Sequence, residues 1–579
     1  MFDDPTLARS RELGQAHRAD YERLVEKYGD AAPESARAPL THSGLPLKTA
    51  YFPHDIDDIA YDDIGAPGRY PFTRGNLPAQ YQLMSWANQP VIGYGLPEHT
   101  RARMDLLTRR GMVGYFGRPF FNLVYDLVSH EGLDPDHPAA RGRIGQCGMA
   151  VYSVADMARL FDGLDPTRMN VVHITYYQVI PALAQYIAYA ERRGVAPEAL
   201  RGNSMNWYHQ SAYVGMSAFP PEQGLKLAVA LIGYCARHMP RWNTTNFFGY
   251  GVEEAGGNAI EEIGLMLAFG IELVAACGEA GLTPDSVLPR FGFQIAQAND
   301  FFEEICKIRA LRRLWATTMR ERFGAEDPRS LHVRIHTHTS GVSLTARQPL
   351  VNLARTTLHA LGAALSGTQA MEVSAYDEAL AIPTEEAATL ALRVQQVIRE
   401  ETNVTAVSDP LAGSYFVEAL TDRMAREALA LVAEVEAEGG YVAAQRSGWI
   451  RRRVEASAAR WREAVDSGER RIVGLNCYEE EEAEDTSVRR PRFTVDPEVE
   501  RVAIARIEAL RAERDGTRHA AALAAFADTA ERVADAELAG LNGDRLMETA
   551  IEAARADATT GEMMGVMKAA FGWRAPHES

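Results

Sequence analysis

The sequence predicts an α/β fold in which parallel strands alternate with helices. From about residue 111 onwards, short runs rich in β-branched and aromatic residues are each followed by a longer stretch with helical periodicity. The candidate strands, in order, are residues 111–117, 170–176, 202–207, 243–249, 290–295, 331–337, 370–375 and, more weakly, 403–409. Eight such units in a row favour a closed barrel over a doubly wound open sheet. No G-x-G-x-x-G sequence follows the first candidate strand.

The segments outside this alternation predict two accessory regions. Residues 1–60 are polar and contain several prolines, which is typical of an arm or linker. The barrel is expected over residues 61–415, and residues 416–579 read as a helical region in which an acidic run forms a solvated connector. Hydrophobic residues make up 46% of the chain and charged residues 24%, as expected for a globular protein with a sizeable core.

The formal net charge of the 579 residues is -18, which argues against a nucleic-acid-binding protein or one that binds an anionic membrane surface. The five cysteines are scattered without a C-x-x-C pair, so we expect neither a zinc ribbon nor a disulfide framework. The first ten residues lack the apolar centre of a signal peptide, and no uncharged apolar run is long enough to span a membrane. We therefore expect a cytoplasmic protein.

Chemistry in a parallel barrel takes place at the C-terminal ends of the strands. At the ends of the candidate strands the sequence places His173, Tyr176, Tyr177, Trp207, Tyr208, His209, Tyr250, Arg290, His336, His338 and Glu372. Period-2 alternation puts His332, Arg334, His336 and His338 on one face of their strand. If that face points inward, the barrel contains a polar channel; alternatively these side chains lie under the helices as satisfied core residues. The set as a whole favours a binding site.

His336 and His338, taken with His173 and Glu372, also resemble a set of metal ligands. The histidine pair falls on the sixth candidate strand (331–337), however, and few carboxylates accompany it, which argues against a metal site. We therefore expect no metal ion.

Several longer stretches together resemble one known family. They include YPFTRGNLPAQYQLMSW (70–86), the segment from 134 to 164, GYGVEEAG (249–256), HTHTSGVSLTARQP (336–349), DPLAGSYFVEALTD (409–422) and TTGEMMGVMKAAFG (559–572). Over residues 68 to 573 the chain is similar to the large subunit of the adenosylcobalamin-dependent acyl-CoA mutases. Methylmalonyl-CoA mutase and isobutyryl-CoA mutase are the best-known members.

This resemblance implies a TIM barrel whose mouth faces the corrin ring of coenzyme B12, with an acyl-CoA threaded along the barrel axis. The cobalamin domain of the family carries a D-x-H-x-x-G motif, which is not found here. We therefore expect no cobalamin-binding domain in this chain, a separate small cobalamin-binding subunit that holds most of the cofactor, and a homo- or hetero-oligomeric assembly.

Positions that match the family imply roles for individual residues. Glu254 and Glu378 match carboxylates near the adenosyl ribose, and Gly93 matches a glycine of the corrin-facing loop. Arg290 and Arg329 match basic residues that contact the CoA chain. His336 matches a histidine at the rim, and Tyr250 matches the tyrosine that precedes a catalytic histidine of the family.

Other positions depart from the family. Gly251 stands where the family has a histidine that hydrogen-bonds the thioester carbonyl, and Met205 stands in place of a glutamine that touches the same group. The position that selects the acyl group falls at Val214 or Gly215. Val91 replaces the aromatic residue that helps to break the cobalt–carbon bond. His173, Tyr176, Trp207, His209 and Glu372 offer a different set of side chains, from which we predict a changed substrate.

Three hypotheses follow from these comparisons of residues. The first is the barrel subunit of a B12-dependent radical isomerase that acts on a non-standard substrate, for which a modified acyl-CoA is one candidate. In it Tyr250, His336 and His338 are the candidate catalytic residues. The second is a catalytically inactive mutase-like subunit that pairs with another protein. The third is a barrel enzyme that has lost its dependence on B12 and uses His336, His338 and Glu372 for polar chemistry.

Overall fold

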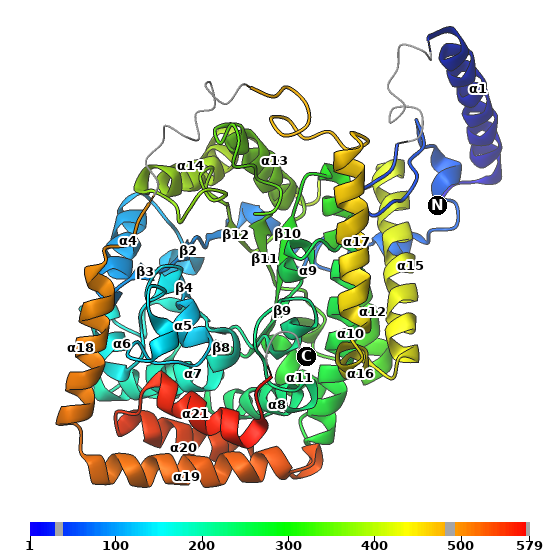
Figure 1. The fold of residues 1–579 in the computed structure, drawn as a ribbon. Coiled ribbons are helices and arrows are strands. Elements are labelled where there is room, and N and C mark those ends of the chain that lie inside the picture. The colour runs from blue at the N-terminus through cyan, green and yellow to red at the C-terminus, as the bar shows by residue number, and fades with distance from the viewer. Residues whose placement is uncertain (29–38, 481–492, 575–579) are drawn as a thin grey trace.

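The computed structural model describes residues 1–28, 39–480 and 493–574, and its centre is a closed parallel barrel (Figure 1). Within these residues the strands occupy eight positions around the ring, all paired in parallel. In ring order they are β1 (Ala87–Asn88) with β2 (Val91–Ile92), β4 (Phe120–Val124), β6 (Asn170–Ile174), β7 (Gly202–Ser204), β8 (Trp242–Asn243) with β9 (Thr245–Phe248), β10 (Phe291–Gln297), β11 (Ile335–Thr339) and β12 (Ala370–Glu372). Pairing of β12 with β1 closes the barrel, so the predicted fold class is confirmed.

Two of the predicted strands are wrong. The segment 111–117 is a loop, because Gly111, Phe116 and Gly117 all have left-handed backbone angles (φ of 93°, 55° and 69°) that no strand accommodates. The segment 403–409 also forms no strand. The first barrel strand lies instead at residues 87–92, where Pro90 separates β1 from β2 because it has no N–H to donate to a ladder.

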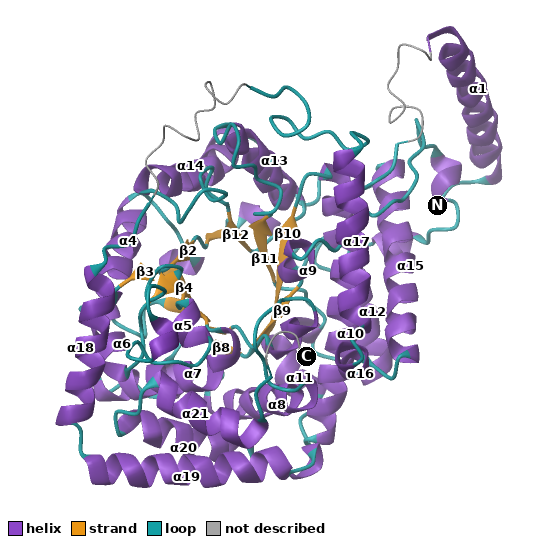
Figure 2. Ribbon diagram, viewed as in Figure 1, coloured by secondary structure: helices purple, strands orange, loops and turns teal. Residues whose placement is uncertain are grey.

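Helices surround the barrel on its outer side (Figure 2). Those that follow the strands are α4 (Pro97–Arg109), α6 (Val154–Leu160), α7 (Val179–Arg192), α8 (Pro221–His238), α10 (Ala259–Glu279), α12 (Phe301–Phe323), α13 (Val351–Leu365) and α14 (Glu385–Glu401). Further helices cover them: α15 (Tyr415–Ala437) packs on α10 and α12, and α20 (Gly543–Arg555) packs on α7 and α8. This second cover explains why α7 and α10 are apolar on almost every side.

The remaining helices of six or more residues extend this cover and the N-terminal arm. They are α1 (Asp4–Tyr28), α16 (Tyr441–Arg446), α17 (Trp449–Asp466), α18 (Glu498–Glu513), α19 (Gly516–Asp535) and α21 (Thr560–Phe571). In Figure 1, α1 stands away from the barrel beside the N-terminus. No single helix among the described residues is long and apolar enough to cross a membrane; α10 and the short helical segment after it pass that test only together, and they are bent by 106°.

Alternation along the strands separates an outer face from an inner face. On β4, Phe121 and Leu123 belong to the main hydrophobic core under the helices, whereas Phe120 belongs to a smaller cluster inside the barrel. On β10, Phe293 and Ile295 face the same outer core, so Gln294 between them faces inward. A ligand-binding site inside the barrel would therefore be formed by the side chains of the inner face.

Candidate active site

The inside of the barrel has two unlike walls. One wall, which we call the apolar wall, consists of Phe120, Val172, Ile174, Met205, Trp207 and Phe248. The opposite wall, on β10 to β12, which we call the polar wall, carries the buried side chains Gln294, His336, His338 and Glu372. A ligand along the axis would therefore meet hydrocarbon on one side and hydrogen-bonding groups on the other.

A cavity of about 570 Å³ occupies the half of the barrel nearest the N-terminal ends of the strands. Val172, Met205 and His336 line its inner part. Its outer part is lined by residues at or before the starts of strands, among them Tyr115, Phe116, Arg118, Asn170, Arg201, Asn243, Arg290 and Arg334. The interior is therefore hollow at this end rather than plugged by aliphatic side chains.

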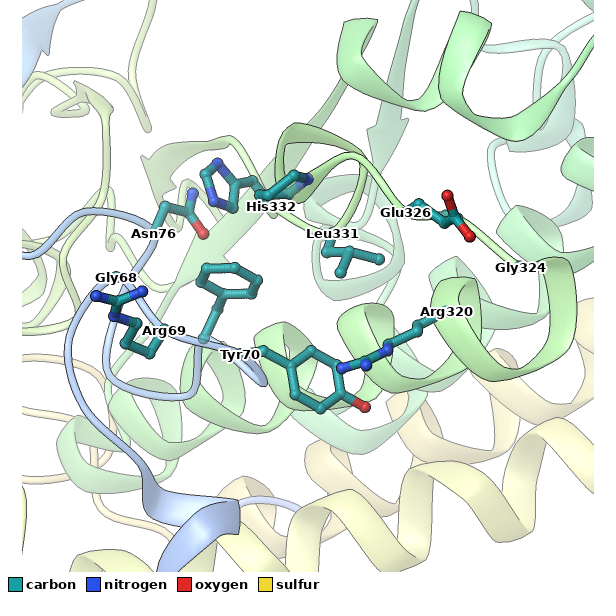
Figure 3. Close-up of a pocket in the computed structure, with 12 residues that line it drawn as sticks. Gly68, Arg69, Tyr70, Asn76, Arg320, Gly324, Glu326, Leu331 and His332 are labelled. Atoms are coloured by element: carbon teal, nitrogen blue, oxygen red, sulfur yellow. The ribbon is translucent and has the colours of Figure 1, made fainter.

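A second cavity of about 840 Å³ lies beside this opening, and Asn76 and His332 line both (Figure 3). Arg320 on α12 places its guanidinium 4.5 Å from the centre of the Tyr70 ring. The Oδ1 atom of Asn76 is buried and has no hydrogen-bond partner among the described residues. The barrel opening thus continues into a wider hollow that combines cationic and aromatic side chains.

Four arginines give the opening an uncompensated positive charge. Arg118, Arg201, Arg290 and Arg334 all line the cavity, and none forms an ion pair with a carboxylate of the described residues. Burial, together with the charges of Arg290 and Arg329, lowers the pKa of Arg334 to about 10. Burial and neighbouring arginines also lower the pKa of Arg290. Cations gathered without counter-ions make this end suitable for a phosphate group.

The sequence predicted only part of this cationic group. Arg290 lies at the opening, but at the N-terminal end of β10 and not at its C-terminal end as expected. Arg329 is paired with Asp327 at 2.6 Å, its side chain is 67% exposed, and it does not line the cavity. Arg201 was missed because only the C-terminal ends of strands were considered; its position just before the predicted strand 202–207 was the available signal. Arg118 was missed because the sequence predicts a strand in the segment before it, 111–117, whereas the observed strand β4 follows it.

One layer above the cavity, His338 and Glu372 face each other. The Nδ1 atom of His338 lies 3.7 Å from Oε2 of Glu372, and neither atom has a hydrogen-bond partner among the described residues. The other oxygen of Glu372 accepts a hydrogen bond of 2.6 Å from the backbone N–H of Val91. The Tyr250 ring stacks on His338, with centroids 4.1 Å apart and planes 6° apart.

Burial fixes the protonation of this pair. It raises the pKa of Glu372 well above its ordinary value and, with the charge of His336, lowers the pKa of His338 well below its ordinary value. Burial also lowers the pKa of His336 to about 3. Burial therefore favours the neutral forms of all three side chains, a carboxylic acid and two imidazoles.

Carboxyl groups gather at the C-terminal rim around Gly341. Glu254 accepts hydrogen bonds from the backbone N–H groups of Gly341 (2.7 Å) and Val342 (3.0 Å). A Cβ atom on Gly341 would lie 3.3 Å from oxygen atoms of Glu254, Glu378 and Tyr250, so all three converge on the space that the glycine leaves. Burial, with the charge of Glu254, raises the pKa of Glu378 to about 7.

Two predicted substrate ligands do not face the interior. His173 hydrogen-bonds Tyr125 at 2.9 Å and packs against Tyr186 of α7, on the outer side of β6. His209 stacks on Phe269 of α10 with centroids 4.2 Å apart. Both predictions are wrong, because these imidazoles lie in the layer between strands and helices. Tyr177 lies in the same outer core.

Two other predicted ligands belong to the apolar wall. Trp207 stacks on Phe248 with centroids 3.9 Å apart, and Tyr176 contacts Trp207 edge-on at 5.3 Å. Tyr176 has a left-handed backbone conformation (φ 47°), which is costly for an aromatic residue and directs its ring over the end of β6. These rings could cover the hydrocarbon part of a ligand.

Gly251 lies in the first turn of α9 (Tyr250–Glu254), two residues beyond the predicted strand 243–249. A Cβ atom here would lie 2.2 Å from Cε1 of Phe248 and 3.0 Å from Cε2 of Tyr213. The rings of Phe248 and Tyr213 therefore fill the space that a larger side chain would need. Gly93 is likewise required by close packing, since its Cβ would lie 2.2 Å from the carbonyl oxygen of Val124.

A hollow parallel barrel with arginines at one end and carboxyl groups at the C-terminal rim is the architecture of the barrel enzymes, whose sites lie at that rim. Comparison with known proteins specifies the family. Residues 40–573 match the methylmalonyl-CoA mutase family. The chain belongs to this family, and it is a coenzyme B12-dependent acyl-CoA mutase of the large-subunit type, an isomerase.

Similar proteins include the methylmalonyl-CoA mutase of Cereibacter sphaeroides, which is 37% identical over 92% of this chain and 72% of its own length. The methylmalonyl-CoA mutase of Escherichia coli K12 is 34% identical over 92% of this chain and 72% of its own length. The 2-hydroxyisobutanoyl-CoA mutase large subunit of Aquincola tertiaricarbonis is 34% identical over 96% of both chains.

Proposed function

We propose that this chain is the barrel subunit of a B12-dependent mutase that rearranges a CoA thioester whose acyl group carries no carboxylate. The observation that carries this proposal is the lack of a cation beside the carboxyl groups at the C-terminal end of the barrel. Glu253, Glu254, Glu372 and Glu378 are buried or nearly buried there, and none is paired with a lysine or arginine of the described residues. A substrate carboxylate would be buried there without a counter-ion.

The two ends of the barrel would share the recognition of the substrate. The arginines of the opening would hold the phosphates of CoA, since guanidinium groups bind phosphate in a bidentate manner. The pantetheine arm would follow the cavity between Met205 and His336. The acyl group would then reach His338, Tyr250 and Glu372, with Trp207 and Phe248 on the opposite side.

The residues of the rim fit the adenosyl part of the cofactor. Oxygen atoms of Glu254, Glu378 and Tyr250 converge at Gly341, where no side chain intervenes, and carboxyl and hydroxyl groups of this kind bind the hydroxyls of a sugar. Adenosylcobalamin, when bound, supplies the homolytic chemistry. This chain's own residues would orient the acyl group and, by enclosing it, exclude water from the reaction.

The cobalt-bearing part of the cofactor would come from a separate small subunit. Residues 1–579 contain no D-x-H-x-x-G sequence, and the chain aligns along 96% of a relative that is named a large subunit. Co-purification with a small cobalamin-binding subunit tests this. We expect the complex, but not the isolated chain, to retain adenosylcobalamin in the visible spectrum. Stoichiometric cobalamin on the isolated chain would contradict a two-subunit cofactor site.

A non-catalytic subunit is the second candidate, and the dense packing of the apolar wall favours it. Phe248 contacts Trp207 and fills the space beside Gly251, so part of the interior is closed. An isotope-exchange experiment separates the two candidates. It measures whether labelled hydrogen moves between a CoA thioester and the adenosyl group of the cofactor. An active barrel exchanges label with at least one CoA thioester, whereas a non-catalytic subunit forms the cofactor complex without exchange.

A further inference from the structure

We infer that Glu372 and His338 together recognise a hydroxyl group on the acyl chain, so that the substrates of this enzyme are hydroxyacyl thioesters. The inference rests on the proposed function and specifies its substrate class. It assigns Glu372 and His338 as specificity-determining residues of the reaction.

The geometry of the pair matches one small group with both a donor and an acceptor. Oε2 of Glu372 and Nδ1 of His338 are 3.7 Å apart, too far for a direct hydrogen bond, and both lack a partner among the described residues. A hydroxyl oxygen placed beside both atoms lies within hydrogen-bonding distance of each. It would accept a hydrogen bond from the neutral Glu372 acid and donate one to His338.

Both side chains are held in place before a ligand arrives. The backbone N–H of Val91 fixes Glu372 through its other oxygen. His338 is fixed by its stacking on Tyr250, and the Tyr250 hydroxyl is hydrogen-bonded to Glu254. Because neither group must be reorganised, the pair is a preorganised recognition element and not a flexible polar contact.

Other acyl groups fit the pair less well. A plain alkyl chain would bury two polar atoms without partners, which is unfavourable. A carboxylate would lie beside the carboxyl groups of Glu372 and Glu378, and no lysine or arginine of the described residues pairs with them. An ammonium group has three donors and no acceptor, so it would require Glu372 to ionise in a site that burial keeps neutral.

The apolar wall determines which kind of acyl group fits beside the hydroxyl. Trp207, Phe248 and Ile174 are all buried and apolar, and they face the polar wall across the barrel. A short hydrocarbon skeleton would lie against them while its hydroxyl points to β11 and β12. We therefore expect a hydroxyacyl group of few carbons.

Equilibrium binding to the full-length chain, measured by calorimetry, tests the inference without turnover. The probes are 3-hydroxybutyryl-CoA, 2-hydroxyisobutyryl-CoA, butyryl-CoA, succinyl-CoA and 3-aminobutyryl-CoA. We expect at least one hydroxyacyl thioester to bind about tenfold to a hundredfold more tightly than butyryl-CoA, and succinyl-CoA to bind more weakly than butyryl-CoA.

Variants show whether the pair is responsible. Glu372→Leu should abolish the hydroxyl preference while butyryl-CoA binds as well as before or better, and Glu372→Gln should restore part of the preference. His338→Phe should behave as Glu372→Leu does. The exposed Glu401→Gln is the control and should change nothing. The comparison among thioesters with the unmodified chain decides the matter even if a variant does not fold.

Several results would overturn the inference. These are equal affinity for hydroxyacyl and plain acyl thioesters, tighter binding of the succinyl or aminobutyryl ester, or a hydroxyl preference that survives in Glu372→Leu. With equal affinities, tighter binding of the aminobutyryl ester or a surviving hydroxyl preference, the thioesters still bind, so the proposed function stands while the inference fails. Tighter binding of the succinyl ester would contradict both, because the proposed function excludes an acyl carboxylate. Absence of binding for every CoA thioester would instead overturn the proposed function, and the inference with it.

Discussion

His338 and Glu372 are direct partners across the pair of parallel strands β11 and β12. The backbone register therefore brings Nδ1 of His338 to 3.7 Å from Oε2 of Glu372, without any contribution from a loop. Sites built on strands hold their geometry more precisely than sites built on loops. The end of the barrel that carries this pair is thus as rigid as the barrel itself.

The first prediction concerns the space beside Gly251. Gly251→Ala should lower the free energy of unfolding by about 1–3 kcal/mol, because the new methyl group would overlap Phe248. Combining it with Phe248→Leu should cost less than the sum of the two single changes, since the smaller side chain makes room. Denaturant unfolding measures both. Gly215→Ala is the matched control, because nothing lies within 4 Å of its Cβ position, and equal costs at the two glycines would contradict the packing described here.

The second prediction concerns the pH dependence of stability. Glu378 has an ordinary pKa of 4.5, which rises to about 7 in the folded protein. Between these values the folded state keeps the proton that the unfolded state releases, so stability falls as pH rises through this interval, by about 3 kcal/mol for this group.

Glu378→Gln should remove that loss, and the stability of the variant should change less than that of the unmodified chain between about pH 4.5 and about pH 7. Thermal unfolding at several pH values measures the slope. Glu401→Gln, an exposed position, should leave the slope unchanged. Identical slopes for Glu378→Gln and the unmodified chain would mean that Glu378 is ionised throughout.

The third prediction concerns the arginines at the barrel opening. Arg290→Gln and Arg201→Gln should each weaken binding of an acyl-CoA by about tenfold or more, because each removes a charge-assisted contact to phosphate. Binding of the matching S-acyl-pantetheine, which has no phosphate, should change little. Arg545→Gln on α20 serves as a remote control. Equal losses for the two ligands would show that the arginines support the fold and not the phosphates.

The sequence alone predicted the histidines of the polar wall. It did not predict, for every strand, which side chains face the inside of the barrel. In residues 331–336 apolar side chains alternate with His332, Arg334 and His336, and continuing this period assigns His338 to the same face. In residues 170–174 apolar side chains stand at both parities, and alternation alone cannot say whether His173 points inward. Its outward position is decided by Tyr186 on the neighbouring helix, which is a tertiary contact.

The resemblance to the family located Glu254, Glu378 and Gly251, but it could not show what occupies the space left by a lost side chain. That depends on the rings of Phe248 and Tyr213. Phe248 is three residues from Gly251 and Tyr213 is 38 residues away, and no sequence pattern shows that both rings turn into this space. The opening was also missed in part, since Arg118 and Arg201 become neighbours only when the barrel closes.

The rearrangement of methylmalonyl-CoA and isobutyryl-CoA by the complex with adenosylcobalamin and the small subunit tests the central claim most directly. The account predicts no detectable product from either thioester, because the catalytic end offers no cation for the first and leaves the Glu372–His338 pair unsatisfied by the second. Conversion of either thioester at a rate comparable to that of a methylmalonyl-CoA mutase, assayed side by side, would contradict it.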